Sequence, residues 1–232
     1  MEKAQFQTIF LDLDDTLLDF GKAEKNALTL AFTEKGINPT EELLSRYSVI
    51  NEEHWKRLEK EEITRDEVKY GRFSQLFDEY GITVSPVETA DIYEKYLGMG
   101  HYFIDGAEEL LSSLYGKYRL YLVSNGTYSV QEGRIASAGL EKYFDGIFIS
   151  EKVGCEKPKK AFFEACFATI PAFSGNETVI IGDSLTSDMR GEKNAGIKTV
   201  WFNRKGRTNT TDMSFDAVTD SLYGLKSIIE KL

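Results

Sequence analysis

Short apolar runs that alternate with helix-like segments constrain the fold of this chain more than any other feature. The runs lie at residues 8–11, 120–123, 146–149, 178–181 and 198–202. Most of their residues are apolar, whereas a strand with one face in water alternates apolar with polar residues. Strands that are separated by helices pair in parallel. The sequence therefore predicts an α/β fold with a doubly wound parallel sheet that helices cover on both faces.

Residues 20–103 contain no comparable run and carry instead the signals of four helices. Thr64-x-x-Glu67 matches the capping box, in which two residues satisfy each other's polar groups at a helix start. Ser85-Pro86-x-Glu88 repeats this pattern and adds proline at the first helical position, where proline is favoured. We expect this segment to be entirely helical.

The place of the helical segment in the chain indicates an inserted domain. We expect a core of residues 1–18 and 104–232, interrupted after its first strand by a helical cap of residues 19–103. Its boundaries are the turn after Leu18 and the segment Gly98-Met99-Gly100, because glycine permits hinge-like changes of the backbone.

Composition and charge limit the location and the partners of the chain. No stretch approaches the roughly 18 consecutive apolar residues that a membrane span requires, and the first residues lack the pattern of a secretory signal. Cys155 and Cys166 form no Cys/His cluster, so we expect a cytoplasmic protein. A net charge of −10 argues against a nucleic-acid polymer as partner. A small phosphorylated metabolite needs only local positive charge.

Two aspartates directly follow the first expected strand, in Asp12-Leu13-Asp14-Asp15-Thr16. In open α/β sheets, ligands bind beyond the carboxyl ends of the strands. Asp12 and Asp14 are two residues apart there and can face one site, one as an attacking group and one as a proton carrier. From the spacing alone, an ordinary acidic turn remains an alternative interpretation. An EF-hand calcium loop does not fit, because its glycine and its distant glutamate are missing.

Two further segments follow expected strands with groups that suit a phosphate. In Ser124-Asn125-Gly126, a hydroxyl, an amide and backbone N–H groups precede a helix and can hold phosphate oxygens. An ordinary turn has the same composition. Lys157 stands just before Pro158, which suits a helix start. A cation is poorly placed at a helix N-terminus, which suggests that an anion binds between them.

The last such segment is Gly182-Asp183-Ser184-Leu185-Thr186-Ser187-Asp188, again between a strand and a helix. Asp183 stands at the strand end and Asp188 in the expected first helical turn, so both can approach one metal ion. Asp188 also suits a helix start on its own. Carboxylate oxygens are hard ligands that favour Mg²⁺ over softer metals.

In order and spacing, these four segments resemble the motifs of the haloacid dehalogenase-like superfamily: DxDxT, a strand ending in Ser or Thr, a lysine, and GDSxxxD. The resemblance implies a Rossmann-like core with a small helical cap. Over residues 11–20, 103–107 and 180–188 the chain also resembles bacterial house-cleaning 5′-nucleotidases that act on pyrimidine nucleotides. Asp15 stands where many relatives carry glycine, and an Asp-Asp-Thr version is familiar in that branch.

The resemblance implies a role for each of these side chains. Asp12 is the nucleophile and Asp14 the general acid/base, while Ser124, with Asn125 beside it, and Lys157 bind the phosphate. Mg²⁺ is implied on Asp12, the backbone carbonyl of Asp14, Asp183 and Asp188. Electrostatics agree, because an anionic aspartate that attacks an anionic phosphoryl group beside other carboxylates needs positive charge nearby.

The expected activity is Mg²⁺-dependent hydrolysis of a phosphomonoester through an aspartyl-phosphate, on nucleoside 5′-monophosphates. Another small ester, such as a sugar phosphate or phosphoglycolate, is the alternative, and a non-catalytic binding module is a second. A dinucleotide-binding enzyme does not fit, because no G-x-G-x-x-G follows a strand. The cap would select the leaving group, and Phe20 beside the first motif is the best candidate. The other cap candidates are His54, Trp55, Arg65 and Arg72.

Overall fold

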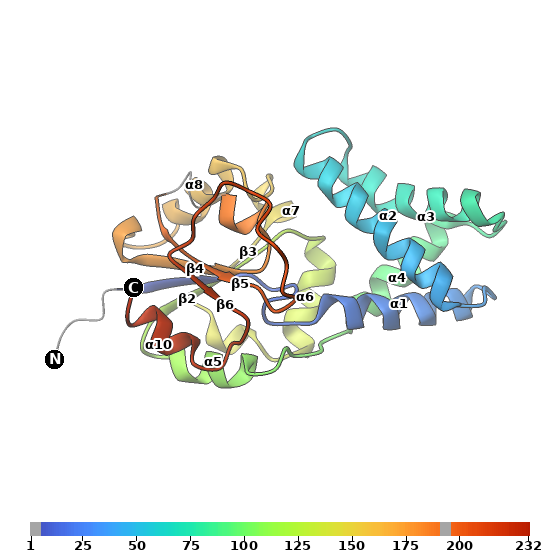
Figure 1. The fold of residues 1–232 in the computed structure, drawn as a ribbon. Helices are drawn as coiled ribbons and strands as arrows, with labels where there is room; N and C mark the ends of the chain where they lie inside the picture. The colour runs from blue at the N-terminus through green and yellow to red at the C-terminus, as the bar shows by residue number, and fades with distance from the viewer. Residues whose placement is uncertain (1–5, 191–195) are drawn as a thin grey trace.

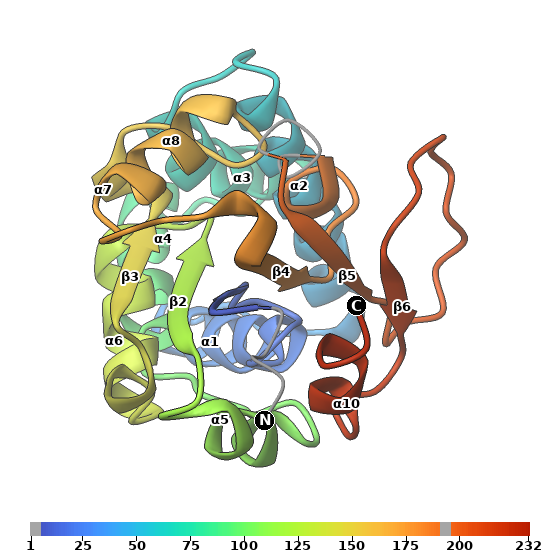
Figure 2. The ribbon, with the colours of Figure 1, turned by 90° about the vertical axis from the view of Figure 1, so that its left-hand side faces the viewer.

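Six parallel strands form one sheet in the order β3-β2-β1-β4-β5-β6 (Figure 2). The computed structural model of the protein describes residues 6–190 and 196–232. The strands are β1 Thr8–Leu11, β2 Arg119–Ser124, β3 Gly146–Ile149, β4 Thr178–Gly182, β5 Lys198–Phe202 and β6 Ala217–Thr219. The predicted parallel α/β sheet is confirmed. Strand β6 was not predicted, because its three residues are partly exposed at the sheet edge and form no apolar run.

Helices connect the strands and cover the sheet. They are α1 Phe20–Glu34, α2 Glu41–Glu59, α3 Arg65–Tyr80, α4 Pro86–Leu97, α5 Ala107–Leu114, α6 Tyr128–Ser137, α7 Ser150–Val153, α8 Lys160–Ala168 and α10 Leu225–Ile229. In the part of the chain that the structure describes, none of the helices has the length and apolar character needed to cross a membrane.

Alternate residues of β1 point to opposite faces of the sheet. Ile9 and Leu11 belong to a hydrophobic cluster that includes residues of α5 and α10. Phe10 belongs to a second cluster, with Phe162 and Phe163 of α8. Because both faces are covered by helices, β1 has no solvent-exposed face, and this explains its apolar run Ile9-Phe10-Leu11.

Helices α1–α4 pack on one another and lie beyond the carboxyl ends of the strands (Figure 1). Their shared hydrophobic cluster centres on aromatic rings, and the Tyr47 and Phe73 rings are 4.8 Å apart. We propose that this helical layer is the cap. The two connections to the core run side by side, since Asp19 N–H donates to the Tyr102 carbonyl at 2.7 Å and Ile104 N–H to the Leu17 carbonyl at 2.9 Å.

The two helix-start patterns in the cap differ in outcome. Thr64 forms the full capping box, since its hydroxyl accepts from Glu67 N–H and the Glu67 carboxylate accepts from Thr64 N–H at 2.7 Å. At the start of α4, Ser85 accepts from Glu88 N–H at 3.3 Å, but the Glu88 carboxylate pairs with Lys35 at 2.5 Å. The second expected box is therefore only half formed, because Lys35, the residue that caps the end of α1, attracts the glutamate.

Thr64→Ala should lower the free energy of unfolding by about 1 kcal/mol, the usual loss when a helix N-cap is removed. Urea denaturation measures this change. Thr29→Ala, within α1, is the matched control, because alanine is favoured inside a helix and this substitution should be neutral or slightly stabilising. Equal effects of the two substitutions would show that the Thr64 cap contributes nothing.

Candidate active site

A cavity of about 230 Å³ lies where the strand order reverses, between the carboxyl ends of β1 and β4 and the helical layer. Ligands of open α/β sheets bind at such a point. All the residues predicted for the catalytic, phosphate and metal sites line this cavity, namely Asp12, Asp14, Ser124, Asn125, Lys157, Asp183 and Asp188.

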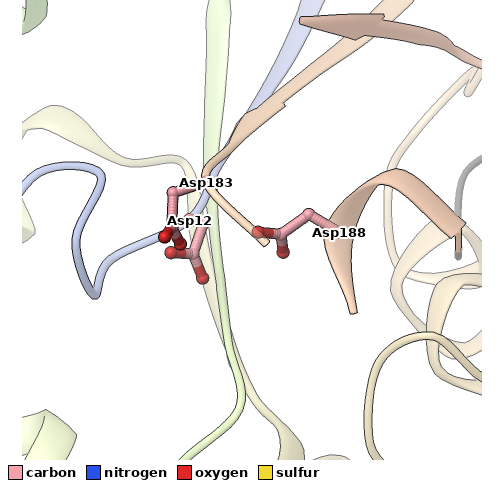
Figure 3. Close-up of side chains that lie close together, drawn as sticks. All are labelled: Asp12, Asp183 and Asp188. Carbon is pink, nitrogen blue, oxygen red and sulfur yellow. The ribbon is translucent and has the colours of Figure 1, made fainter. Parts of the chain in front are cut away.

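Three of these aspartates form a compact acidic cluster (Figure 3). Asp12, Asp183 and Asp188 offer carboxylate oxygens that lie within 4.8 Å of one another. Parallel pairing of β1 with β4 brings the first two together, and Asp12 N–H donates to the Ile181 carbonyl at 3.0 Å. Gly182 makes room for the third, because a Cβ at that position would lie 2.8 Å from the Asp188 Cβ.

Burial and mutual repulsion disfavour the charged forms of this cluster. Burial raises the pKa of Asp12 well above its usual range, and Asp188 and Asp183 add to this while Lys157 opposes it. Burial, and then Asp188, raise the pKa of Asp183 to about 7, against the opposing charge of Arg207. Two buried carboxylates and a partly buried one, with too little compensating charge, are a donor set that fits a hard divalent cation such as Mg²⁺.

Lys157 is almost completely buried, and its ammonium group has three partners. Its Nζ donates to Asp12 Oδ1 at 2.7 Å, to Asp188 Oδ1 at 2.6 Å and to the Val123 carbonyl at 3.0 Å. Burial alone lowers the pKa of a lysine, but here Asp12 and Asp188 outweigh it and raise the pKa of Lys157. The lysine is therefore held as a cation beside Asp12 Oδ1.

The local structure around Lys157 differs from our expectation. Helix α8 begins at Lys160 with Lys159 as its N-cap, so the predicted helix start at Pro158 is wrong by two residues. Lys157 is held instead by Asn125. The Asn125 Oδ1 accepts from Lys157 N–H at 2.9 Å, and its Nδ2 donates to the Lys157 carbonyl at 2.8 Å. The Asn125 side chain is thus engaged with protein backbone.

Ser124 and Asp14 share a partner, Gln131, that the sequence did not indicate. The Gln131 Nε2 donates to Ser124 Oγ at 2.8 Å and to Asp14 Oδ2 at 2.7 Å, and Arg134 forms an ion pair with Asp14 Oδ1. Gln131 and Arg134 are buried polar residues of α6. Their helical spacing is also that of an ordinary solvated face, so the sequence carried no signal for them.

A second group of missed residues lies in the loop between β5 and β6. Arg204 pairs with Asp19 at 3.2 Å, Lys205 pairs with Asp15 at 2.5 Å, and Arg207 pairs with Asp183. The signal was present as the basic segment Arg204-Lys205-Gly206-Arg207, close after a strand. These cations offset part of the negative charge around the cavity.

The cap candidates divide into two groups. Phe20, Trp55 and Arg72 line the cavity, whereas His54 and Arg65 are not among its lining residues. The buried His54 lies with its Nδ1 2.9 Å from the Ile50 carbonyl within α2. Arg65 bridges cap and core, because its guanidinium donates to Ser150 Oγ at 2.6 Å and pairs with Glu156 at 2.9 Å.

Comparison with known proteins places the chain among hydrolases. The family model of the haloacid dehalogenase-like hydrolases matches residues 6–196. The HAD-hydrolase YfnB of Bacillus subtilis is 40% identical over 90% of this chain and 89% of its own length. The pyrimidine 5′-nucleotidase PynA of Streptococcus pneumoniae is 37% identical over 98% of both chains. The pyrimidine 5′-nucleotidase YjjG of Escherichia coli is 27% identical over 96% of this chain and 97% of its own.

A crystal structure of YfnB bound to magnesium, in which interdomain movement was found, superimposes with a TM-score of 0.92. The two chains are 39% identical, and the match covers 97% of this chain and 99% of that one. The likeness therefore extends over the core and the helical layer together.

We expect Mg²⁺ to stabilise this protein more at about pH 8 than at about pH 5.5, because protons compete for its raised carboxyl groups. Folding raises the pKa of the Asp183 carboxyl group to about 7, so the metal-free protein becomes less stable as the pH rises towards 7. Below this pH, the affinity for Mg²⁺ should fall by up to about tenfold per pH unit. Thermal unfolding with Mg²⁺ or EDTA at both pH values measures this.

Asp183→Asn is the control for this effect, because the amide has no proton to lose and should abolish most of the Mg²⁺ response. An equal Mg²⁺ response at both pH values in the unsubstituted protein would contradict the prediction.

Proposed function

The chain belongs to the haloacid dehalogenase-like hydrolases, and on that premise we propose that it is a Mg²⁺-dependent phosphomonoesterase that forms an aspartyl-phosphate on Asp12. One observation carries the proposal. The Lys157 ammonium lies 2.7 Å from Asp12 Oδ1, in a cluster where Asp183 and Asp188 can hold a cation. The Lys157 ammonium opposes the rise in the pKa of Asp12, as a bound cation would also do, and it offers positive charge to an anionic substrate.

In the first step an Asp12 oxygen attacks phosphorus, and the bond from phosphorus to the leaving oxygen breaks. Asp14 gives its proton to that oxygen, so that an alcohol leaves. Water then attacks the aspartyl-phosphate, Asp14 takes a proton from it, and Asp12 is regenerated with release of phosphate. When bound, Mg²⁺ supplies charge that stabilises the phosphoryl oxygens, and we assign it to Asp12, the Asp14 carbonyl, Asp183 and Asp188.

Ser124 suits a phosphate-binding role because of the way its hydroxyl is held. Its Oγ accepts a hydrogen bond from Gln131, so its own O–H is available to donate to a phosphate oxygen. The Asn125 side chain would contribute to phosphate binding indirectly, because it holds the backbone of Lys157. The backbone N–H of Asn125 would be a further donor to the phosphate.

We further propose nucleoside 5′-monophosphates as the substrates. The pyrimidine 5′-nucleotidases PynA and YjjG match nearly the whole chain, which supports this narrower claim. Phe20 and Trp55 line the cavity on the cap side and offer apolar surface to a base or sugar. A sugar phosphate or another small ester is the alternative substrate.

Asp12→Asn should reduce phosphatase activity on p-nitrophenyl phosphate at least about a thousandfold, because an amide is a poor nucleophile and forms no acyl-phosphate. Steady-state kinetics with Mg²⁺ measure the loss, and circular dichroism checks that the fold persists. The exposed Asp78→Asn in α3 is the matched control and should behave as the unsubstituted protein does. Retained turnover by Asp12→Asn, or full activity in EDTA, would overturn the mechanism.

In a screen of phosphate esters, pyrimidine nucleoside 5′-monophosphates should be hydrolysed with the highest kcat/KM. Trp55→Ala should raise their KM about tenfold, as loss of one aromatic contact of about 1.4 kcal/mol predicts, and leave the KM of glycerol phosphate unchanged. Equal kcat/KM for all nucleotides and sugar phosphates would remove the nucleotidase proposal and leave that of a phosphatase.

A further inference from the structure

Both carboxylate oxygens of Asp14 are engaged by one turn of α6. Gln131 donates to one oxygen at 2.7 Å, and Arg134 forms an ion pair with the other. The two side chains also bond to each other, since the Arg134 guanidinium donates to Gln131 Oε1 at 3.0 Å. A carboxylate with both oxygens bound in this way has a fixed orientation as well as a fixed position.

The chain makes specific room for this arrangement. A Cβ on Gly126 would lie 2.8 Å from the Gln131 side chain, so glycine is required there for Gln131 to reach Asp14 and Ser124 together. The amide of Gln131 thereby joins the predicted proton carrier to the predicted phosphate ligand. Gln131 itself lies outside the four sequence motifs.

Arg134 is completely buried and extends the same network to the cap. Its Nε donates to the Gly100 carbonyl at 3.1 Å, and its guanidinium lies 5.8 Å from the centre of the Phe20 ring. On the preceding residue of α6, a Cβ on Gly133 would lie 2.7 Å from the Gly98 carbonyl oxygen. Helix α6 is therefore fitted closely against the glycine segment that leads from α4 back to the core.

We infer that Gln131 and Arg134 are positioning residues for Asp14, which they orient towards the leaving oxygen and connect to residues 98–100. The inference rests on the proposed function, because it assigns Asp14 the transfer of a proton. A buried arginine is costly unless its partners compensate for the water that it loses. The carboxylate of Asp14 is the acidic group paired with Arg134 among the described residues. The position of Arg134 beside Asp14 is thus a feature of the site rather than of the hydrophobic core.

The test compares two esters that differ in their need for a proton donor. An alkyl phosphate such as a nucleoside 5′-monophosphate needs a proton on its leaving oxygen, whereas p-nitrophenyl phosphate releases a stable phenolate and needs little help. Positioned general acids contribute about 100-fold to 10,000-fold. Arg134→Met and Gln131→Met should therefore lower kcat for the alkyl ester by about 30-fold to 100-fold, with KM within about twofold, and for the aryl ester by about threefold or less.

Three further variants make the result decisive. Asp14→Asn sets the reference and should show the same dependence on the ester, to a larger extent. Arg134→Lys should recover part of the alkyl-ester activity, because it restores the charge but not the fork of the guanidinium. Arg119→Met is the matched control, since Arg119 bonds to the Pro171 carbonyl and to Thr8 at the amino end of the sheet, and it should leave both rates unchanged.

The outcomes separate the two claims. If the unsubstituted protein hydrolyses neither ester, or if Asp14→Asn shows no dependence on the ester, the proposed function fails. If Asp14→Asn behaves as expected but the Arg134 and Gln131 variants lose equal activity on both esters, or change only KM, the positioning role is overturned. Should Arg134→Met fail to fold, Gln131→Met and Arg134→Lys decide the question by the same ratio.

Discussion

The buried ammonium group of Lys157 is the interaction on which the rest of the site depends. It lies between Asp12 and Asp188, and without it three carboxylates would share a space from which water is largely excluded. Breaking a buried ion pair by removing one partner typically costs about 3–5 kcal/mol, because the other charge is left without compensation. The lysine therefore stabilises the cluster, and the remaining negative charge is what a divalent cation would neutralise.

In the core, strand pairing, one glycine and hydrogen bonds to the backbone bring these charged groups together. Neighbouring parallel strands β1 and β4 bring Asp12 and Asp183 to one edge of the sheet, and Gly182 leaves space for Asp188. Asn125 hydrogen-bonds to both the N–H and the carbonyl of Lys157. These bonds hold the loop so that the Lys157 side chain lies in the cluster. Each relation is local, but the charges that it brings together come from segments far apart in the chain.

The helical layer is joined to this centre mainly through α6 and the paired connections at residues 17–19 and 102–104. Val130 of α6 packs in the hydrophobic cluster of the layer, while Gln131 and Arg134 of the same helix bond to Asp14. The position of the layer and the orientation of Asp14 therefore share one rigid element. In the structure of YfnB bound to magnesium, interdomain movement was found.

The sequence by itself determined strands β1–β5, the helical segment between the first two and the residues at the strand ends, because these are local properties. Continuously apolar runs predict buried parallel strands, and polar residues directly after them must lie at one edge. Only the tertiary structure decided which groups meet these residues. Gln131 and Arg134 look like a solvated helix face, and the basic residues 204–207 look like a loop, until the fold brings them to Asp14, Asp15, Asp19 and Asp183. Charge pairing between distant segments leaves no periodic trace in the sequence, so it becomes visible only when the chain is folded.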